Sequence, residues 1–305
     1  MKDLNTTFCG ITFPNPFILP SGIITEIPAH KKAEESGAGG ITTKSLTVEK
    51  REGYPIPRII RFDQGFLNSV GFRGPGIKAG KDQVKNLIKS VKVPVIASIF
   101  STRLTEIEIL AKEIASISPS LIELDISCPH VEDEYSKALA MGEKTAYEAV
   151  KVAKKEVGKI PLIIKLSPNY SQVAQVAKAC EEAGADAISA INTVGPGMII
   201  DIKTKKPLLG NKRGGVSGPA ILPIAVRCVY DIYESVKIPI IGIGGVTTLE
   251  DVLQMFMAGA TLVGVGSATY TKGMKVFEEL KQGLADYMAK ENIKSLKDII
   301  GIAHK

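Results

Sequence analysis

The residues best suited to chemistry lie where a mostly apolar run ends. The run Leu121–Ile126 is followed by Ser127 and Cys128, and then by Pro129 and His130, in the segment LDISCPH. The ends of parallel strands are where barrel and open-sheet α/β folds place their reactive side chains. A free cysteine is also commonly a small buried hydrophobe. The surroundings of this strand end therefore decide between a reactive and a structural thiol.

Two lysines occur in or beside apolar strand-like segments. Lys44 lies near the end of the segment ITTKS, and Lys165 lies inside PLIIKLS. A buried lysine is costly unless something pairs with it, although at a barrel rim either side chain could extend to solvent. With Asn192 and Thr193 at the end of a further segment, the lysines indicate polar groups that converge on a planar, electron-accepting ligand. A flavin is such a ligand, because a lysine beside the reduced ring stabilises its negative charge.

Two glycine-containing segments come last in the series of apolar runs. GIGGV holds Gly244 and Gly245, and GVGSA holds Gly266 and Ser267. Glycine lets the backbone turn its N–H groups toward a ligand, and the following segment TTLEDVLQ begins a helix whose N-terminus favours an anion. The ends of the last two strands of a parallel barrel usually bind phosphate. A tight turn would explain either segment alone, but together they favour a phosphate site.

Eight short apolar segments would position these groups. Each is typical of a strand, and amphipathic segments such as Glu143–Val157 and Ser171–Ala185 separate them. Apolar strands that alternate with helices predict parallel strands covered on both faces. Eight such units without a break in composition favour an α/β fold of the (β/α)8 or TIM-barrel type over a doubly wound sheet. The strand segments begin at Phe17, Ile41, Val93, Leu121, Pro161, Ala187, Ile238 and Leu262.

The connections support the barrel. ESGAGGITTK, EEAGADAIS and MAGATLVGV each pass from a helix through glycine and alanine to a strand, which is a short αβ connection. Residues 195–220 are too many for a simple turn. We expect them to cross the active face as an excursion that contains a two-stranded ribbon around MIIDIKTKKPLL.

Composition narrows the class of protein. With 305 residues, 45% of them hydrophobic, the chain can bury the core of one large barrel. No stretch of about 18 uncharged apolar residues predicts a membrane span, and the N-terminus does not have the pattern of a secretory leader. The net charge of +6 is spread over mixed runs, which indicates solvated helix faces rather than a nucleic-acid site. Four cysteines without a CxxC pair argue against a structural zinc site or an iron–sulfur cluster in this chain, and for a reducing cytoplasm.

The motifs resemble those of the class 1 dihydroorotate dehydrogenases. LPSG, TTKSLT, NSVGF, SCP, IIKLSPN, INTV, GGVSGPA, IGIGGV and VGVGSA occur in that family's order, from about Cys9 to Tyr270. The chain is also similar to the pyrimidine-reducing domain of dihydropyrimidine dehydrogenase. The resemblance implies that residues 1–305 form one FMN-binding (β/α)8 barrel domain, with an N-terminal β-hairpin and inserted loops over the C-terminal face. It also implies oxidation of dihydroorotate to orotate in de novo pyrimidine biosynthesis.

The resemblance assigns roles to residues. Cys128, with Ser127 beside it, matches the base that takes the C5 proton while the C6 hydride passes to flavin N5. A thiol suits this role because cations can lower its pKa toward the working pH. Lys44 matches a residue close to both ligands, and no metal is implied. The positions that match FMN-binding residues are Ser21, Lys44, Ser45, Ser98, Lys165, Ile191, Ser217, Gly218, Gly244, Gly245, Gly266 and Ser267. Those that match pyrimidine-binding residues are Lys44, Asn68, Ser69, Val70, Gly71, Phe72, Asp125, His130, Asn192 and Thr193.

Three positions depart from the orotate pattern. Asp125 and His130 replace the asparagines of the motif Asn-x-Ser-Cys-Pro-Asn, and Arg73 replaces an amide after NSVGF. Histidine at the second place is typical of the dihydropyrimidine dehydrogenases. An ionised aspartate only accepts hydrogen bonds and would repel the carboxylate of orotate, unless Arg73 or His130 compensates. Two alternatives stay open: reduction of uracil or thymine, and a flavin-binding barrel without turnover. Arg73 itself either reads the substrate carboxylate or is a surface residue of a loop.

The electron acceptor and the partners also follow from the resemblance. Without an N-terminal helical extension, the membrane-bound, quinone-using class is not expected. The other classes use fumarate directly or an iron–sulfur flavoprotein subunit that passes electrons to NAD, and the FCGI and NPF segments and IGIGGV resemble the partner-using class more. No GxGxxG follows a strand, so NAD would act through that second, FAD-containing subunit. The resemblance further implies a homodimer, a small-molecule dihydropyrimidine substrate and a cytoplasmic enzyme.

Overall fold

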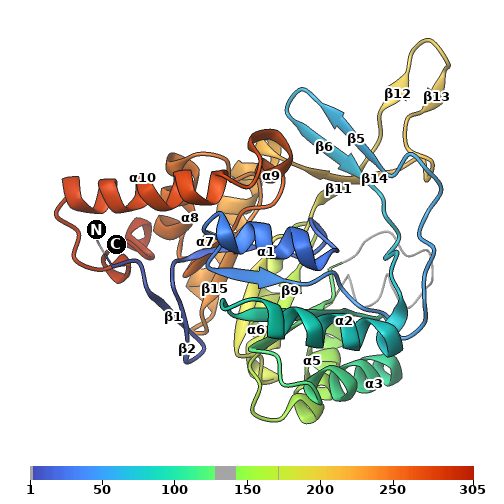
Figure 1. Ribbon diagram of the computed structural model, residues 1–305, viewed down its shortest axis with the longest axis horizontal. Coiled ribbons are helices and arrows are strands. Elements are labelled where there is room, and N and C mark those ends of the chain that lie inside the picture. Colours follow the sequence, from blue (N-terminus) through green and yellow to red (C-terminus); the bar gives the residue numbers. More distant parts are fainter. Residues whose placement is uncertain (1–2, 128–141, 171) are drawn as a thin grey trace.

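Eight parallel strands close into a barrel at the centre of the molecule (Figure 1). The computed structural model describes residues 3–127, 142–170 and 172–305, so Cys128 and His130 lie outside the described residues. Neighbours in the ring are consecutive among the barrel strands along the chain, and each predicted strand segment overlaps one of them. The predicted (β/α)8 barrel is therefore confirmed. Its strands are β3 (Phe17–Leu19), β4 (Gly40–Thr42), β7 (Val95–Phe100), β8 (Leu121–Asp125), β9 (Leu162–Leu166), β10 (Ala187–Ala190), β15 (Ile240–Ile243) and β16 (Leu262–Gly264).

The helices follow the apolar spacing of the sequence. In α5 (Glu143–Val157) the buried Ala146, Val150, Ala153 and Val157 recur every three or four residues, and this helix has its predicted bounds. α6 (Val173–Glu182) is shorter than its predicted segment. None of the helices in the described ranges is long and apolar enough to span a bilayer. The others are α1 (Ile27–Glu35), α2 (Gly76–Ser90), α3 (Leu104–Ala115), α7 (Leu222–Ser235), α8 (Leu249–Ala258), α9 (Ala268–Lys272) and α10 (Val276–Lys290).

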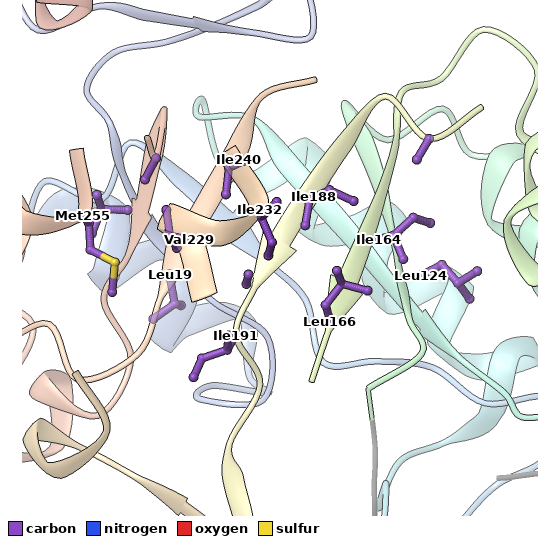
Figure 2. Packing of buried hydrophobic residues seen from close by; sticks show 14 of the residues in the cluster. Leu19, Leu124, Ile164, Leu166, Ile188, Ile191, Val229, Ile232, Ile240 and Met255 are labelled. Carbon is purple, nitrogen blue, oxygen red and sulfur yellow. The ribbon is translucent and has the colours of Figure 1, made fainter. Parts of the chain in front are cut away.

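Side chains that point outward from the barrel pack under these helices. Leu124 of β8 and Ile164 of β9 belong to the same buried core as Val229 and Ile232 of α7 (Figure 2). Each of the four side chains is fully buried. Burying a leucine, isoleucine or valine contributes roughly 1.5–3 kcal/mol. This core fixes the strands, and with them the positions of the strand ends.

Three helix-to-strand connections turn on a glycine. Gly37, Gly184 and Gly259 follow α1, α6 and α8 and have φ angles of +100°, +102° and +118°. Residues other than glycine rarely adopt this conformation. At Gly259 a Cβ atom would also lie 2.3 Å from the ring of Tyr233. The three predicted αβ connections are therefore confirmed, with glycine required at each turn.

Phe8 and Phe13 close the N-terminal end of the barrel. They belong to the antiparallel hairpin of β1 (Thr6–Phe8) and β2 (Ile11–Phe13), which confirms the predicted N-terminal hairpin. Their rings meet edge to face with centroids 6.2 Å apart. They pack against the inward-pointing apolar side chains of the strands, which are Ile18, Ile96, Leu121, Ile163, Ala187, Ile241 and Leu262. Apolar packing fills this end of the barrel, and the inward polar side chains lie nearer the other end.

A small antiparallel sheet rises beside the C-terminal ends of the barrel strands. Its order is β11 (Val194–Gly197), β14 (Gly214–Ser217), β6 (Gly65–Asn68) and β5 (Ile59–Phe62). The ribbon of β12 (Ile200–Asp201) and β13 (Lys206–Pro207) extends beyond it (Figure 1). The predicted excursion and ribbon are confirmed, whereas the β5–β6 hairpin was not predicted. Because β6 pairs with β14, Asn68 at the start of NSVGF lies opposite Gly215 of GGVSG.

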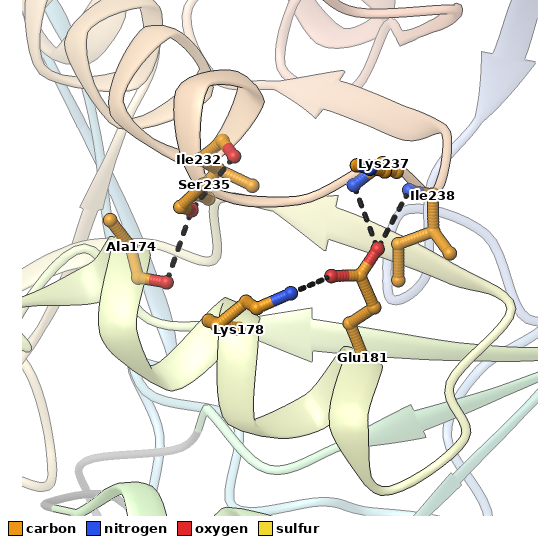
Figure 3. A network of polar contacts seen from close by, with 7 residues as sticks. All are labelled: Ala174, Lys178, Glu181, Ile232, Ser235, Lys237 and Ile238. Carbon is orange, nitrogen blue, oxygen red and sulfur yellow. Dashed lines mark hydrogen bonds and ion pairs between the residues drawn. The ribbon is translucent and has the colours of Figure 1, made fainter.

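Glutamates on α1 and α6 hold the loops that precede β7 and β15 (Ile240–Ile243). Glu181 of α6 accepts hydrogen bonds from the backbone N–H groups of Lys237 (2.7 Å) and Ile238 (3.3 Å), and from Lys178 Nζ (2.7 Å) (Figure 3). Glu34 of α1 does the same, at 2.6 and 3.1 Å, for two N–H groups before β7. Both carboxylates satisfy backbone donors that no strand partner reaches. They tie neighbouring βα units together.

Candidate active site

A cavity of about 220 Å³ opens at the C-terminal ends of the barrel strands, between the barrel and the small sheet. Ser98 and Ser127 do not line it and are buried behind its wall. Cys128 and His130 lie outside the described residues. The predicted ligand-binding residues that do line it are Ser21, Lys44, Ser45, Asn68, Ser69, Val70, Gly71, Phe72, Asp125, Lys165, Ile191, Asn192, Thr193, Ser217, Gly218, Gly244, Gly245, Gly266 and Ser267. The structure thus brings residues from the whole length of the chain to one cavity.

Ser127 ties two strand ends together. Its Oγ atom lies 2.5 Å from Oδ1 of Asp125 and 2.6 Å from Nδ2 of Asn192. An ionised carboxylate only accepts, so the Ser127 hydroxyl donates its one proton to Asp125 and accepts a proton from Asn192. The Thr193 N–H donates to Oδ1 of Asn192 at 2.8 Å, which fixes the orientation of that amide. Asn192 and Asp125 therefore offer a hydrogen-bond donor and an acceptor on the same cavity wall.

Lys44 stands over a pair of stacked aromatic rings. Its Nζ atom lies 4.9 Å from the centroid of Phe72, and Phe72 stacks on Phe100 with centroids 3.6 Å apart and planes 9° apart. The φ angle of Phe72 is +52°, which is rare for a bulky side chain and costs of order 1–3 kcal/mol. The stack and the cation–π contact offset this strain. The strained loop thus holds the Lys44 ammonium at the cavity wall.

Lys165 reaches the cavity from inside the barrel. It lies on β9, in register with Asp125 on β8 and Ser189 on β10, and it is buried. Glu123, on the same strand as Asp125, is also buried. Burial raises the pKa of the Glu123 carboxyl, and the positive charge of Lys165 opposes that rise. The costly buried lysine that the sequence indicated therefore lies in the field of buried carboxyl groups.

Ser98 was predicted to contact FMN, but the structure places it one layer below the cavity wall. It is on the inward face of β7, two residues before the strand ends, so its side chain points into the barrel below the rim. Its Oγ donates to Glu123 Oε1 at 2.9 Å and lies 2.9 Å from the Oγ of Ser45. Ser98 therefore reaches the cavity only through Ser45.

Glycine loops provide unpaired backbone donors at the cavity. The N–H groups of Gly244, Gly245, Gly266 and Ser267 have no hydrogen-bond acceptor among the residues that the structure describes. The φ angles of Gly244 and Gly245 are +137° and +78°, which a residue with a Cβ atom would resist. Convergent, unpaired N–H groups of this kind bind anions such as phosphate.

The close packing of α7 explains why glycine is needed in this loop. A Cβ atom on Gly244 would lie 2.6 Å from the Cβ of Ala225, and one on Gly245 would lie 2.8 Å from Leu222. The predicted contribution from the start of α8 is reduced, because Asp251 already accepts the N–H groups of Thr247 and Thr248, both at 2.8 Å. The candidate anion site therefore consists of loop donors rather than the start of α8.

Two aromatic residues that the sequence analysis missed also line the cavity. Phe66 of β6 and Tyr270 of α9 have ring centroids 5.7 Å apart. The Tyr270 hydroxyl donates to the carbonyl of Ile23 at 3.0 Å, and burial raises its pKa. The turn residues Asp63, Gln64 and Gly65 between two β-branched and aromatic runs were the signal for this hairpin.

Of two nearby arginines, Arg51 and not Arg73 lines the cavity. Arg73, which the sequence analysis considered as the residue that reads a carboxylate, is exposed. Arg51 and Gly74 exchange two backbone hydrogen bonds of 2.9 and 3.0 Å, so the backbone of Arg51 is held beside the loop that follows Phe72. Tyr54 of the same segment also lines the cavity. The side chain of Arg51, although also exposed, therefore places a positive charge at the cavity, at a position that the sequence did not indicate.

The cysteines in the described ranges are not activated. Burial raises the pKa of Cys9 and Cys180 to about 12 and that of Cys228 to about 11, so their thiols stay protonated at neutral pH. Within the same ranges, no group of three or more histidine, cysteine, aspartate or glutamate side chains is arranged to hold a metal ion. Cys128 remains the candidate thiol, next to the described and buried Ser127.

A (β/α)8 barrel with unpaired glycine N–H groups, two lysines and a fixed donor–acceptor pair around one cavity has the architecture of an enzyme that binds an anionic cofactor and a small polar substrate. The family model described as dihydroorotate dehydrogenase matches residues 3–288. The chain belongs to the dihydroorotate dehydrogenase family, which confirms the resemblance of its motifs.

Its relatives include catalytic subunits from archaea. The chain is similar to the "Dihydroorotate dehydrogenase B (NAD(+)), catalytic subunit" of Pyrococcus abyssi (41% identical, covering 99% of each chain) and to that of Pyrococcus furiosus (42%, covering 97% of each). The Methanothermobacter thermautotrophicus protein of the same name is 37% identical, covering 99% of this chain and 98% of its own. The crystal structure of DHODH from Eimeria tenella in complex with ferulenol superposes with a TM-score of 0.85 at 20% identity, covering 99% of this chain and 89% of that one. The similarity to the Eimeria tenella structure shows that the two chains share a fold.

Proposed function

We propose that this chain oxidises dihydroorotate to orotate in de novo pyrimidine biosynthesis, with FMN as its bound cofactor. One observation carries the proposal. A single cavity joins Lys44, the Asp125–Ser127–Asn192 network and the unpaired glycine N–H groups, in a chain of the dihydroorotate dehydrogenase family.

The residues of the cavity fit FMN. The unpaired N–H groups of Gly244, Gly245, Gly266 and Ser267 suit a phosphate, which needs donors and no positive side chain. Lys165 supplies positive charge from the barrel interior, where it would favour added negative charge on a ring. When bound, FMN accepts the hydride that the substrate carbon gives up.

The donor–acceptor pair fits a pyrimidine. A ring amide edge presents one N–H and one carbonyl, and these complement the carboxylate of Asp125 and the amide nitrogen of Asn192. The Ser127 hydroxyl already donates to one partner and accepts from the other, so it positions both rather than acting as a free base. We propose that Cys128, which follows Ser127 in the chain, is the base that removes the C5 proton of the substrate. Lys44 would lie close to both the flavin and the substrate.

A second candidate is the reduction of uracil or thymine. Asp125 is buried on the cavity wall and would repel a substrate carboxylate, so it favours a neutral pyrimidine. Arg51 offers the compensating charge for an anionic one. Because the family and Arg51 both favour dihydroorotate, this substrate ranks first.

We also propose partners for the reaction. The relatives are named catalytic subunits of an NAD(+)-dependent enzyme, so we assign this chain to an assembly with a second, iron–sulfur and FAD-containing subunit that passes electrons to NAD. We further propose that the chain forms a homodimer and works in the cytoplasm.

Product analysis tests the proposal. Purified protein is denatured to identify its flavin by chromatography, and native protein is incubated with dihydroorotate and an artificial electron acceptor. We expect one FMN per chain and the formation of orotate. A protein that holds no FMN, or that holds FMN and forms no orotate, would contradict the proposal.

A further inference from the structure

A chain of three hydroxyl groups leads from the cavity to a buried carboxyl group. Ser21 Oγ, on the cavity wall, lies 3.1 Å from Ser45 Oγ. Ser45 Oγ lies 2.9 Å from Ser98 Oγ, which in turn lies 2.9 Å from Oε1 of Glu123. Ser45, Ser98 and Glu123 are all buried. The proposed function gives no role to Ser98 or Glu123.

The charge of Glu123 dictates the direction of the whole chain. Each serine has one proton to donate. An ionised Glu123 can only accept, so Ser98 donates to it, Ser45 donates to Ser98 and Ser21 donates to Ser45. Ser21 then has only lone pairs left for a ligand in the cavity.

Protonation of Glu123 along this chain reverses every hydrogen bond. Ser98 passes its proton to Oε1 of Glu123, Ser45 replaces the proton of Ser98, and Ser21 replaces that of Ser45. Ser21 takes a proton that water in the cavity relays from the solvent, so one proton enters from the solvent and one carboxylate is neutralised. Afterwards Glu123 donates to Ser98, and Ser21 donates into the cavity.

The charges around Glu123 are few. Its own strand carries Asp125, and β9 carries Lys165; these are the two charged residues of the described chain whose fields act on it. β7, on the other side, faces it with the neutral Ser98. Both charged neighbours line the cavity, so a change of charge there reaches Glu123 through a buried, poorly screening medium.

We propose that Glu123 is a positioning residue that couples electron uptake in the cavity to proton uptake in the barrel interior, through Ser98, Ser45 and Ser21. The inference rests on the proposed function only in that a flavin occupies the cavity. Negative charge added to the cavity favours the neutral form of Glu123, and the reversed chain then presents a donor to that charge. The reduction potential of the bound flavin therefore depends on pH more steeply than the flavin alone requires.

The experiment measures the midpoint potential of the bound flavin between pH 5.5 and 9 by reductive titration with dithionite, without a pyrimidine. The variants are Glu123→Gln, which removes the charge and keeps the size, and Ser98→Ala, which cuts the hydroxyl chain and keeps the charge. Exposed Glu108→Gln is the control. In the wild type we expect a pH range in which one extra proton accompanies two electrons. That is a further tenfold change in the oxidised-to-reduced ratio per pH unit, or about 30 mV.

We expect both Glu123→Gln and Ser98→Ala to lose the extra slope, and Glu108→Gln to keep it. Equal slopes in the wild type and Glu123→Gln would overturn the inference. If the midpoint potential of Ser98→Ala kept the wild-type dependence on pH, the role of the hydroxyl chain would be overturned. If Glu123→Gln does not fold, Ser98→Ala alone decides. A protein that binds flavin and shows no coupling leaves dihydroorotate oxidation intact, whereas a protein without flavin would contradict both proposals.

Discussion

Asn192 and Ser127 are 65 residues apart in the chain, yet their side chains share a hydrogen bond of 2.6 Å. They follow β10 and β8, so the bond spans the end of the intervening strand β9. Through it, the carboxylate of Asp125 determines which groups face the cavity. The donor and the acceptor that we assign to the substrate depend on this one hydroxyl.

Replacing Ser127 with alanine tests that dependence. The amide nitrogen of Asn192 loses its acceptor and Asp125 loses a donor, so we expect kcat/KM for dihydroorotate to fall about 10-fold, a loss of ~1.4 kcal/mol. FMN content should not change. Ser116→Ala, which removes an exposed hydroxyl bonded to a backbone carbonyl, is the matched control. If the effects of Ser127→Ala and Asn192→Ala were simply additive, the two residues would not act as a unit.

The two arginines of the substrate loop should differ. Arg51 lines the cavity and Arg73 does not, so we expect Arg51→Ala to raise KM for dihydroorotate by about 10-fold or more, equivalent to ~1.4 kcal/mol. Arg73→Ala should change it by less than about 2-fold, as expected for an exposed charge that does not line the cavity. The KM for dihydrouracil, which has no carboxylate, should stay the same in both variants. A larger effect on this KM from Arg73→Ala than from Arg51→Ala would show that Arg73 binds the substrate carboxylate.

Gly245→Ala should weaken FMN binding. Gly245 has a φ angle of +78°, and a Cβ atom would lie 2.8 Å from Leu222, so the loop must shift and its N–H groups move from the anion. We expect at least a ~10-fold loss of affinity for FMN. Gly158→Ala is the control, because Gly158 has a φ angle of +62° and open space around it. Both variants should melt at lower temperature, but only Gly245→Ala should lose flavin. A fully flavin-loaded Gly245→Ala protein would place the phosphate elsewhere.

Cys128→Ala should abolish turnover and leave FMN bound. Loss of a positioned general base costs ~10²–10⁴-fold in rate. The thiols of Cys9, Cys180 and Cys228 have raised pKa values and cannot replace it. The measurement is the rate of flavin reduction by dihydroorotate, compared with that of Cys9→Ala. Reduction at the wild-type rate in Cys128→Ala would make this cysteine structural.

Much of the fold could be predicted from the sequence because the barrel strands are continuous apolar runs. Residue type and spacing also indicate the core under the helices and the glycine turns at Gly184 and Gly259. The sequence indicates the β5–β6 hairpin less clearly. Its strand β5 alternates exposed and half-buried residues outside the main core, and β6 pairs with a strand about 150 residues away.

The positions of Ser98 and Arg73 relative to the cavity could not be predicted from residue type. Ser98 and Ser45 both belong to strand ends that reach the cavity, but two residues of strand place Ser98 below the rim. Arg51 and Arg73 are equally polar in the sequence, and the backbone pairing of Arg51 with Gly74 determines which one faces the cavity. Such differences depend on register between distant segments, which residue type does not encode.

Anaerobic reduction of the bound flavin tests the central claim most directly. The purified protein is mixed with dihydroorotate, dihydrouracil or dihydrothymine, and the loss of yellow flavin absorbance is followed. The account predicts rapid and complete bleaching by dihydroorotate and little by the other two. Bleaching by dihydrouracil or dihydrothymine but not by dihydroorotate would contradict the assignment of dihydroorotate as substrate, and bleaching by none would leave a flavin-binding barrel without turnover.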